Sequence, residues 1–211
     1  MIIELPKRIN LTNAKIQGNY LILYEKNDFE NTMYELTYVL RKNRCIYCGR
    51  KLGKYNKSLD HRYPRVYGGI SVTNNLFPCC STHNSEKSDM NHEQYLKYKK
   101  LRQKQRKELK KTFLEMNEKI LKEKGFILPK NWVFFTNRSK IRFRKYKNSI
   151  RGKKYAKIAE FYGKYKKLPR PIIVDKNYNF LKGYNVLLFA CDNNINIVPV
   201  VMLENVILLT K

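Results

Sequence analysis

The chain has 211 residues, and 44 lysines and arginines against 17 acidic residues give it a net charge of +27. This excess is larger than solubility requires and indicates a polyanionic partner. A content of 43% hydrophobic and 13% aromatic residues excludes a wholly disordered basic tail. No apolar run reaches the roughly 18 residues of a transmembrane helix, and the N-terminus does not resemble a signal peptide. We therefore expect a cytoplasmic protein with no membrane partner.

The chain order suggests four segments, and the first two differ sharply in character. Residues 1–43 contain a strand candidate at 20–24, followed by a helix in which apolar residues recur at helical spacing. We interpret that apolar stripe as packing. Residues 44–92 are instead rich in Cys, Gly, Pro, Asn and Ser and show little periodicity. Such a composition is typical of a loop-rich module held by a metal.

The third segment, residues 93–160, is strongly basic. Its first part, 93–124, is predicted to be one long helix that stops at Gly125. Residues 97–111 carry nine basic side chains against a single acidic one, and 138–154 carry nine and no acidic one. Either run alone is typical of a solvated surface. Two such runs in a chain of this charge favour contact with nucleic acid.

The second basic run has an alternating pattern that predicts a strand. One face would turn apolar residues to the core and the other would turn basic residues to phosphates: Lys140, Arg142 and Arg144 alternate with Ile141 and Phe143.

The fourth segment, residues 161–211, changes to an apolar pattern. A strand is predicted at 172–174, a turn at 175–179, a helix at 183–192 and a second strand at 197–203. This order indicates a small α/β unit.

Five cysteines are present, and four of them fall between residues 45 and 80. Cys45 and Cys48 form a CxxC pair, and Cys80 and His83 repeat that separation after 31 intervening residues. Two such pairs supply the thiolate and imidazole ligands of a closed tetrahedral zinc site. The alternative is a set of unrelated buried thiols. Cys79 is left for packing or as a spare thiol.

A second set of polar residues accompanies these pairs. Hydrolysis of a phosphodiester needs a base for water, a divalent cation at the phosphate and a group that orients the base. His61 can accept a proton near neutral pH, and Asp60 and Asn84 are oxygen ligands suited to Mg²⁺. Asn75 can bond His61 or the backbone near it. Taken alone, His61 is more typical of a hydrogen-bonded loop histidine than of a catalytic base.

Residues 45–88 resemble the HNH endonuclease family, the ββα-metal nucleases, in the variety whose catalytic hairpin is held by a four-ligand zinc. The matching string is CxxC, DHxxP, GG, NNL and CxxHN, with Lys87 three residues later. The resemblance covers about a fifth of the chain. It implies a structural zinc, two strands around Asp60 and Asn75, and a helix that opens near His83.

The resemblance also implies residue roles. His61 is the general base, Asn75 orients it, and Asp60 and Asn84 bind the catalytic Mg²⁺ or Mn²⁺. Asn84 stands where some relatives have histidine, and His83 completes the zinc set where cysteine is commoner. The expected fold class is α+β: a zinc-stabilised ββα-metal (HNH) module with a long basic helix and a small C-terminal α/β unit.

The C-terminal unit resembles the ParB-like (sulfiredoxin-like) domain. The matching strings are PIIVD from residue 171, LKGY from residue 181 and VPV from residue 198. Relatives usually carry a phosphate-binding arginine where this chain has Val186. We therefore expect docking or DNA contact from this unit, without nucleotide hydrolysis.

Double-stranded DNA is the expected partner, although the charge is equally compatible with RNA. The residues expected to contact it are basic positions near the motif and in the two basic runs: Arg62, Lys87, Lys99, Lys100, Arg102, Lys104, Arg106, Lys107, Lys140, Arg142, Arg144 and Lys145.

The sequence thus predicts a metal-dependent DNA endonuclease, bacterial or phage-encoded, of the homing, phage or restriction type. The alternative is a catalytically inactive zinc-containing module that binds nucleic acid. The joint presence of Asp60, His61, Asn75 and Asn84 favours the enzyme, because binding alone has no chemical need of them. One active site cuts one strand, so a monomer is expected to nick, and cleavage of both strands would need a dimer or sequential nicks.

Overall fold

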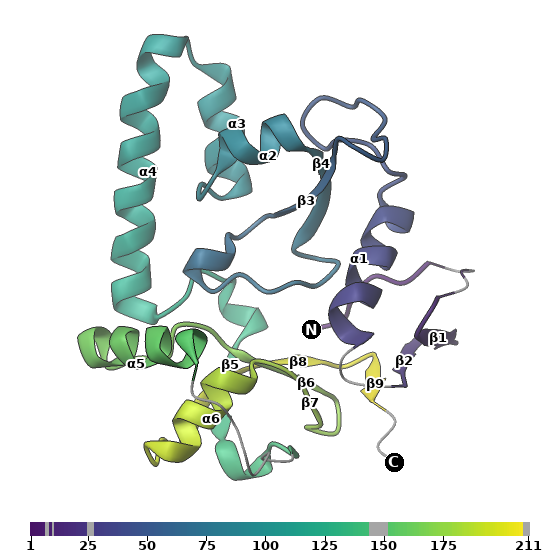
Figure 1. Ribbon diagram of the computed structural model, residues 1–211, viewed down its shortest axis with the longest axis vertical. Helices are drawn as coiled ribbons and strands as arrows, with labels where there is room; N and C mark the ends of the chain where they lie inside the picture. Colours follow the sequence, from purple (N-terminus) through teal and green to yellow (C-terminus); the bar gives the residue numbers. More distant parts are fainter. Residues whose placement is uncertain (7–8, 10, 25–27, 144–151, 209–211) are drawn as a thin grey trace. The chain divides into compact units, whose positions relative to one another are not determined.

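The computed structural model describes most of the chain, namely residues 1–6, 9, 11–24, 28–143 and 152–208 (Figure 1). Helices make up 42% and strands 22%, which confirms the α+β class. The chain packs as two units: residues 1–32 with 128–211, and residues 33–127. These units cut across the four expected segments, because residues near the two ends of the chain pair in one sheet. Among the described helices, none is both long and apolar enough to cross a membrane.

The first unit contains a small sheet built from both ends of the chain. Strands β1 (Ala14–Gln17) and β2 (Tyr20–Leu23) are antiparallel, and β9 (Val206–Leu208) runs parallel to β2. Ile3 and Asn205 reinforce this pairing through two hydrogen bonds of 2.9 Å. β2 confirms the strand predicted at 20–24. The helix predicted after it is α1 (Phe29–Leu40), and the boundary between the two units falls within it.

A four-stranded sheet with the order β5-β8-β6-β7 forms the core of the first unit. Strand β8 is parallel to β6 and antiparallel to β5, whereas β7 is antiparallel to β6. Helix α6 connects β7 to β8 and packs with α5. The element bounds are β5 Phe134–Asn137, α5 Lys153–Tyr165, β6 Ile172–Asp175, β7 Phe180–Lys182, α6 Tyr184–Asp192 and β8 Ile197–Leu203.

The strands and helix predicted for residues 172–203 are therefore confirmed as β6, α6 and β8. Sequence patterns did not reveal β5, β7 or α5. β7 has only three residues, which is too short for an alternating pattern to stand out. α5 follows the basic run, and its Lys-rich composition masked an apolar face on which Ile158 is buried.

The strand predicted at 140–144 is wrong. Arg138–Lys140 forms a short 3-10 turn, and Arg142 makes one isolated bridge to Asn179. The alternation survives locally, since Ile141 is buried and Arg142 is exposed. Up to Phe143, where the described part of this segment ends, strand pairing therefore consists of a single bridge although the side chains still alternate. Arg144 and Lys145 lie outside the described residues.

The second unit is built around a β-hairpin followed at once by a helix. Strand β3 (Lys57–His61) pairs antiparallel with β4 (Leu76–Cys80), with Asp60 opposite Phe77. Helix α2 (Ser81–Lys87) begins directly after β4 and packs against β3. The loop between the strands contains a 3-10 turn at Arg65–Tyr67. This arrangement agrees with the two strands and the helix expected around the motif.

The single helix predicted at 93–124 is wrong, because the chain breaks it into α3 (His92–Lys100) and α4 (Gln103–Lys124). Leu101 and Arg102 are extended. The Arg106 guanidinium donates to the carbonyls of Leu101 at 2.9 Å and Lys99 at 3.1 Å, so it covers the exposed end of α3. The predicted stop is confirmed, since Gly125 caps α4 with a φ of 86°.

Asp175 in the first unit is fully buried and accepts four hydrogen bonds. Three come from the turn at Asn177 and Asn179, and the fourth comes from the Leu208 amide of β9 at 3.0 Å. Asp175→Ala leaves these donors without their acceptor, so we expect the free energy of unfolding to fall by about 3 kcal/mol or more. Denaturant titration measures this change. Asp175→Asn keeps one acceptor oxygen and serves as the milder control. If the free energy of unfolding fell by less than about 1 kcal/mol in the alanine variant, the account would be contradicted.

Candidate functional site

The structure brings Cys45, Cys48, Cys80 and His83 together, with their potential ligand atoms within 4.8 Å of one another. The Sγ atoms of Cys45 and Cys80 are 3.8 Å apart, and His83 Nδ1 lies 3.0 Å from Cys80 Sγ and 3.7 Å from Cys45 Sγ. Sulfur ligands at about 2.3 Å from a tetrahedral ion lie about 3.8 Å apart. The four groups could therefore hold a metal ion such as zinc.

Two local features place these ligands. After the first pair the chain turns tightly, because Gly49 adopts a φ of 70° and its amide donates to the Cys45 carbonyl at 2.8 Å. The second pair uses the start of α2, where Cys80 is the N-cap and His83 lies one turn further on. Burial raises the pKa of Cys45, but backbone amides of Cys80, Tyr47 and Cys48 outweigh it and lower that pKa to about 6. A thiol with a lowered pKa is a ready metal ligand.

Cys79 is not one of the four grouped ligands, although it packs against Cys45 and Cys80. It is fully buried, and its thiol donates to the Cys80 carbonyl at 3.1 Å. Burial, followed by the nearby Cys45 thiolate, raises its pKa. These properties agree with the packing role expected for Cys79 and with Cys80 as the ligand.

The packing of α2 against β3 sets up a second group of polar residues. Side chains two apart on a strand share a face, so Ser58 and Asp60 both turn toward α2. Residues three apart on a helix also share a face, and these are Asn84 and Lys87. Asn84 Nδ2 donates to Ser58 Oγ at 2.7 Å, and Lys87 Nζ forms an ion pair with Asp60 Oδ1 at 2.8 Å.

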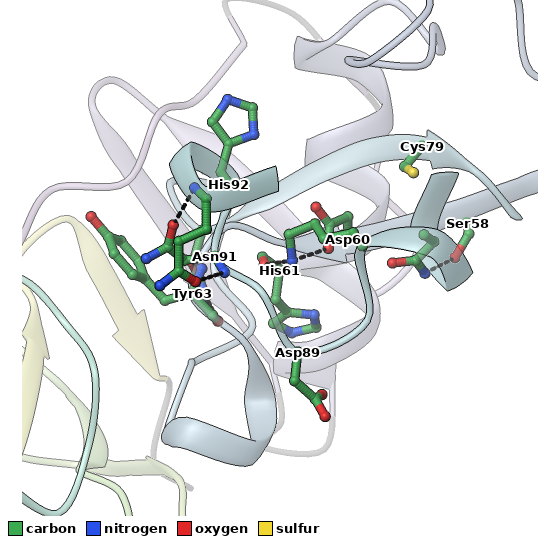
Figure 2. A network of polar contacts seen from close by, with 12 residues as sticks. Ser58, Asp60, His61, Tyr63, Cys79, Asp89, Asn91 and His92 are labelled. Carbon is green, nitrogen blue, oxygen red and sulfur yellow. Dashed lines mark hydrogen bonds and ion pairs between the residues drawn. The ribbon is translucent and has the colours of Figure 1, made fainter. Parts of the chain in front are cut away.

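Asp60 lies next to His61 on β3 (Figure 2), is buried, and has a partner for each of its oxygens. Lys87 contacts Oδ1, and the Tyr47 hydroxyl donates to Oδ2 at 2.5 Å. Burial, followed by the charge of Asp60, raises the pKa of Tyr47, so its hydroxyl stays protonated and acts as the donor. Each carboxylate oxygen has two acceptor sites, so Asp60 retains the capacity to bind a cation. Carboxylate and amide oxygens such as those of Asp60 and Asn84 suit a hard divalent ion.

His61 follows Asp60 on β3 (Figure 2), and its ring lies near Ser71. His61 Nε2 is 3.1 Å from Ser71 Oγ. His61, Asp60 and Asn84 line one pocket of about 470 Å³, together with Lys87 and residues of α1 and of the loop after β3. Three of the sequence-predicted polar residues therefore share one cavity.

Asn75, the fourth of these residues, acts on the backbone rather than on the imidazole. It is fully buried; its amide donates to the carbonyls of Tyr63 at 3.2 Å and Ile70 at 2.8 Å, and its Oδ1 accepts from the Tyr63 amide at 2.8 Å. These bonds close the loop that follows His61. The loop tolerates only glycine at position 69, because a Cβ there would lie 1.8 Å from the Tyr63 carbonyl oxygen.

Of the basic residues expected to contact nucleic acid in the second unit, several are instead engaged within the protein. Lys87 is 1% exposed and paired with Asp60, so it does not offer its charge to a surface ligand. Lys99 lies 3.2 Å from His83 Nε2, Arg62 pairs with Glu93, and Arg106 covers the end of α3. The exposed members are Lys100, Arg102 and Lys107.

The remaining basic positions are distributed as follows. Lys140 and Arg142 are exposed in the first unit. The side chain of Lys104 is not among those described, and Arg144 and Lys145 lie outside the described residues. Val186, in the position of the ParB-like arginine, is 1% exposed on α6 and packs in the core.

Sequence reasoning missed three residues of the site. Tyr47 links the Cys/His cluster to Asp60, Ser71 contacts His61, and His92 Nδ1 lies 3.2 Å from the Tyr47 hydroxyl. Tyr47 lies inside the CxxC pair, where only its position could have drawn attention. Ser71 lies between the GG and NNL parts of the matched string without belonging to either, and His92 lies beyond the string, so no sequence signal marked them.

The chain was compared with protein-family models, curated proteins and solved structures. No family model, no curated protein and no solved structure matches this chain.

The neighbouring cysteines allow a direct test of the ligand assignment. We expect wild-type protein to bind one zinc per chain, Cys80→Ala to lose it and Cys79→Ala to retain it, because of the two only Cys80 is among the four grouped ligand side chains. Zinc content after gel filtration, measured by mass spectrometry, gives the answer. Zinc retained by Cys80→Ala and lost by Cys79→Ala would reverse the assignment.

Proposed function

We propose that this protein is a metal-dependent endonuclease of the HNH type that hydrolyses phosphodiester bonds in DNA. The observation that carries the proposal is the pocket in which Asp60, His61 and Asn84 meet, on a hairpin and helix that also supply Cys80 and His83 of the Cys/His cluster. These groups are the base and the hard oxygen ligands that phosphodiester hydrolysis requires.

His61 is the proposed general base. We assign its Nε2–H to Ser71 Oγ, 3.1 Å away, which leaves Nδ1 to accept a proton from the attacking water. Ser71 is buried, so its hydroxyl holds the ring in one orientation. Asn75 supports the same geometry indirectly, because it fixes the backbone at Tyr63, two residues after His61.

Asp60 and Asn84 would hold a catalytic Mg²⁺ or Mn²⁺. When bound, such an ion stabilises the negative charge that develops on the phosphate. The chain itself fixes both ligands in advance: Tyr47 and Lys87 hold the Asp60 carboxylate, and Ser58 accepts from the Asn84 amide.

A zinc ion at the Cys/His cluster would be structural. Four protein ligands leave no open position for water, so the ion would connect the CxxC pair, Cys45 and Cys48, to the start of α2. Tyr47 lies inside the CxxC pair, and its hydroxyl donates to the Asp60 carboxylate, so it connects this pair to Asp60.

DNA would be gripped through its phosphates. Lys100, Arg102 and Lys107 are exposed around the break between α3 and α4, and Lys140 and Arg142 are exposed in the first unit. Contacts of this kind bind without reading sequence. We therefore propose backbone binding with nicking as the monomer's activity, in a homing, phage or restriction setting.

One observation favours the alternative of an inactive nucleic-acid-binding module. The ammonium of Lys87 already neutralises Asp60, so the carboxylate has a partner without any added ion. In an inactive module, the pocket would bind no divalent cation and the protein would bind DNA without cutting it.

His61→Ala tests the proposed base. We expect cleavage of supercoiled plasmid in Mg²⁺ or Mn²⁺ to fall at least about 100-fold, because the variant removes the proton acceptor. DNA affinity, measured by fluorescence anisotropy, should change less than twofold. Tyr55→Ala, at a side chain that is 92% exposed in the same module, is the control and should cleave like wild type. Wild-type rates in His61→Ala would show that another group is the base.

Salt dependence tests the phosphate contacts. With about six phosphates neutralised, the logarithm of DNA affinity should fall with the logarithm of salt concentration at a slope of about −5. Alanine at Lys100, Arg102 and Lys107 should reduce that slope by about 3. The control carries the same loss of charge at the other end of α4, at Lys119, Lys122 and Lys124, and should keep most of the slope. Equal slopes for the two triple variants would contradict the proposed contact surface.

A further inference from the structure

The buried ion pair between Lys87 and Asp60 costs desolvation free energy, and the proposed mechanism does not itself require it. The side chain of Lys87 is 1% exposed and that of Asp60 is 4% exposed. Removing two charges from water carries a desolvation penalty that their attraction often fails to repay. The pair lies in the same pocket as His61 and Asn84.

Lys87 holds the site at two points. Its Nζ is 2.8 Å from Asp60 Oδ1 and donates to the His61 carbonyl oxygen at 3.0 Å. It therefore connects α2 to two successive residues of β3, one a proposed metal ligand and the other the proposed base. Tyr47 holds the second oxygen of Asp60, so the carboxylate cannot rotate without breaking a hydrogen bond.

A divalent cation that binds Asp60 must approach this ammonium. Like charges a few ångströms apart in a partly buried site repel strongly, because water screens them poorly. In the absence of an ion, the same ammonium supplies the positive charge that the buried carboxylate needs.

We propose that Lys87 is a positioning residue that acts as an internal counter-ion. It fixes Asp60 before metal binds, and its positive charge weakens the affinity of the pocket for divalent cations. This inference rests on the proposed function, since it assumes that Asp60 is a metal ligand. The role of Lys87 is to position Asp60 and the His61 backbone and to set the metal concentration at which the site fills.

The test measures Mn²⁺ affinity on zinc-loaded full-length protein, by the electron paramagnetic resonance signal of free Mn²⁺. Zinc loading keeps Mn²⁺ out of the Cys/His cluster. Lys87→Met and Lys87→Gln remove the charge, and the glutamine variant retains an N–H donor in case the methionine variant fails to fold. Lys87→Arg keeps the charge and is the matched control. Asp60→Asn identifies the site, because it weakens the proposed ligand.

We expect the neutral variants to bind Mn²⁺ at least about tenfold more tightly than wild type, Lys87→Arg to bind within about threefold of wild type, and Asp60→Asn to lose the site. Mn²⁺ should also raise the melting temperature of the neutral variants more than that of wild type, because the ion replaces the missing counter-ion. If Asp60→Asn loses the site but the neutral variants bind no more tightly than wild type, Lys87 does not compete with the cation and the inference is overturned while the proposed function stands. If no variant shows a Mn²⁺ site that depends on Asp60, the inference and the proposed catalytic metal both fail.

Discussion

The packing of α2 against β3 is the contact on which the rest of the candidate site depends. One face of the strand carries Ser58 and Asp60, and one face of the helix carries Asn84 and Lys87, so the two elements meet through polar groups rather than through an apolar seam. Such groups are costly to bury without partners, and here each has one. The first turn of the same helix carries His83, so a metal at the cluster would anchor the helix that positions the pocket.

Tyr47 makes the cluster and the pocket one continuous network. Its ring packs edge-on against Tyr95 of α3, with centroids 4.7 Å apart, while its hydroxyl reaches Asp60. Tyr95 in turn donates to Glu86 on α2. A displacement of the CxxC segment that contains Tyr47 would therefore move the buried Asp60 carboxylate as well as the metal ligands. This connection helps to hold the polar groups of the module in fixed positions.

Local sequence signals predicted the parts of the fold in which spacing determines geometry. The CxxC and CxxH spacings predicted the cluster, and the resemblance to HNH endonucleases implied that Asp60, His61 and Asn84 would share one site. The alternating and helical patterns of residues 172–203 predicted β6, α6 and β8. Each ligand pair and each strand or helix is local in the chain, whereas the joining of Cys45 with Cys80 and of Asp60 with Asn84 needed the whole motif string.

Long-range pairing was not predictable in the same way. The parallel pairing of β2 with β9 joins the two ends of the chain, and each strand is too short to reveal its partner. The break between α3 and α4 depends on Arg106, whose guanidinium covers the free carbonyls of α3 instead of facing solvent. Lys87 likewise reads as a surface charge in the sequence and is buried only because Asp60 lies opposite it.

The central claim is that this pocket directs water to a phosphodiester, and the fate of that water's oxygen tests it most directly. DNA would be cleaved by zinc-loaded protein with Mg²⁺ in water enriched in ¹⁸O, and the phosphate at the new terminus would be analysed by mass spectrometry. The account predicts one ¹⁸O atom in that phosphate for each cut, and at least about 100-fold less labelled product from His61→Ala. Cleavage without incorporated label, or labelled product at the wild-type level from His61→Ala, would contradict it.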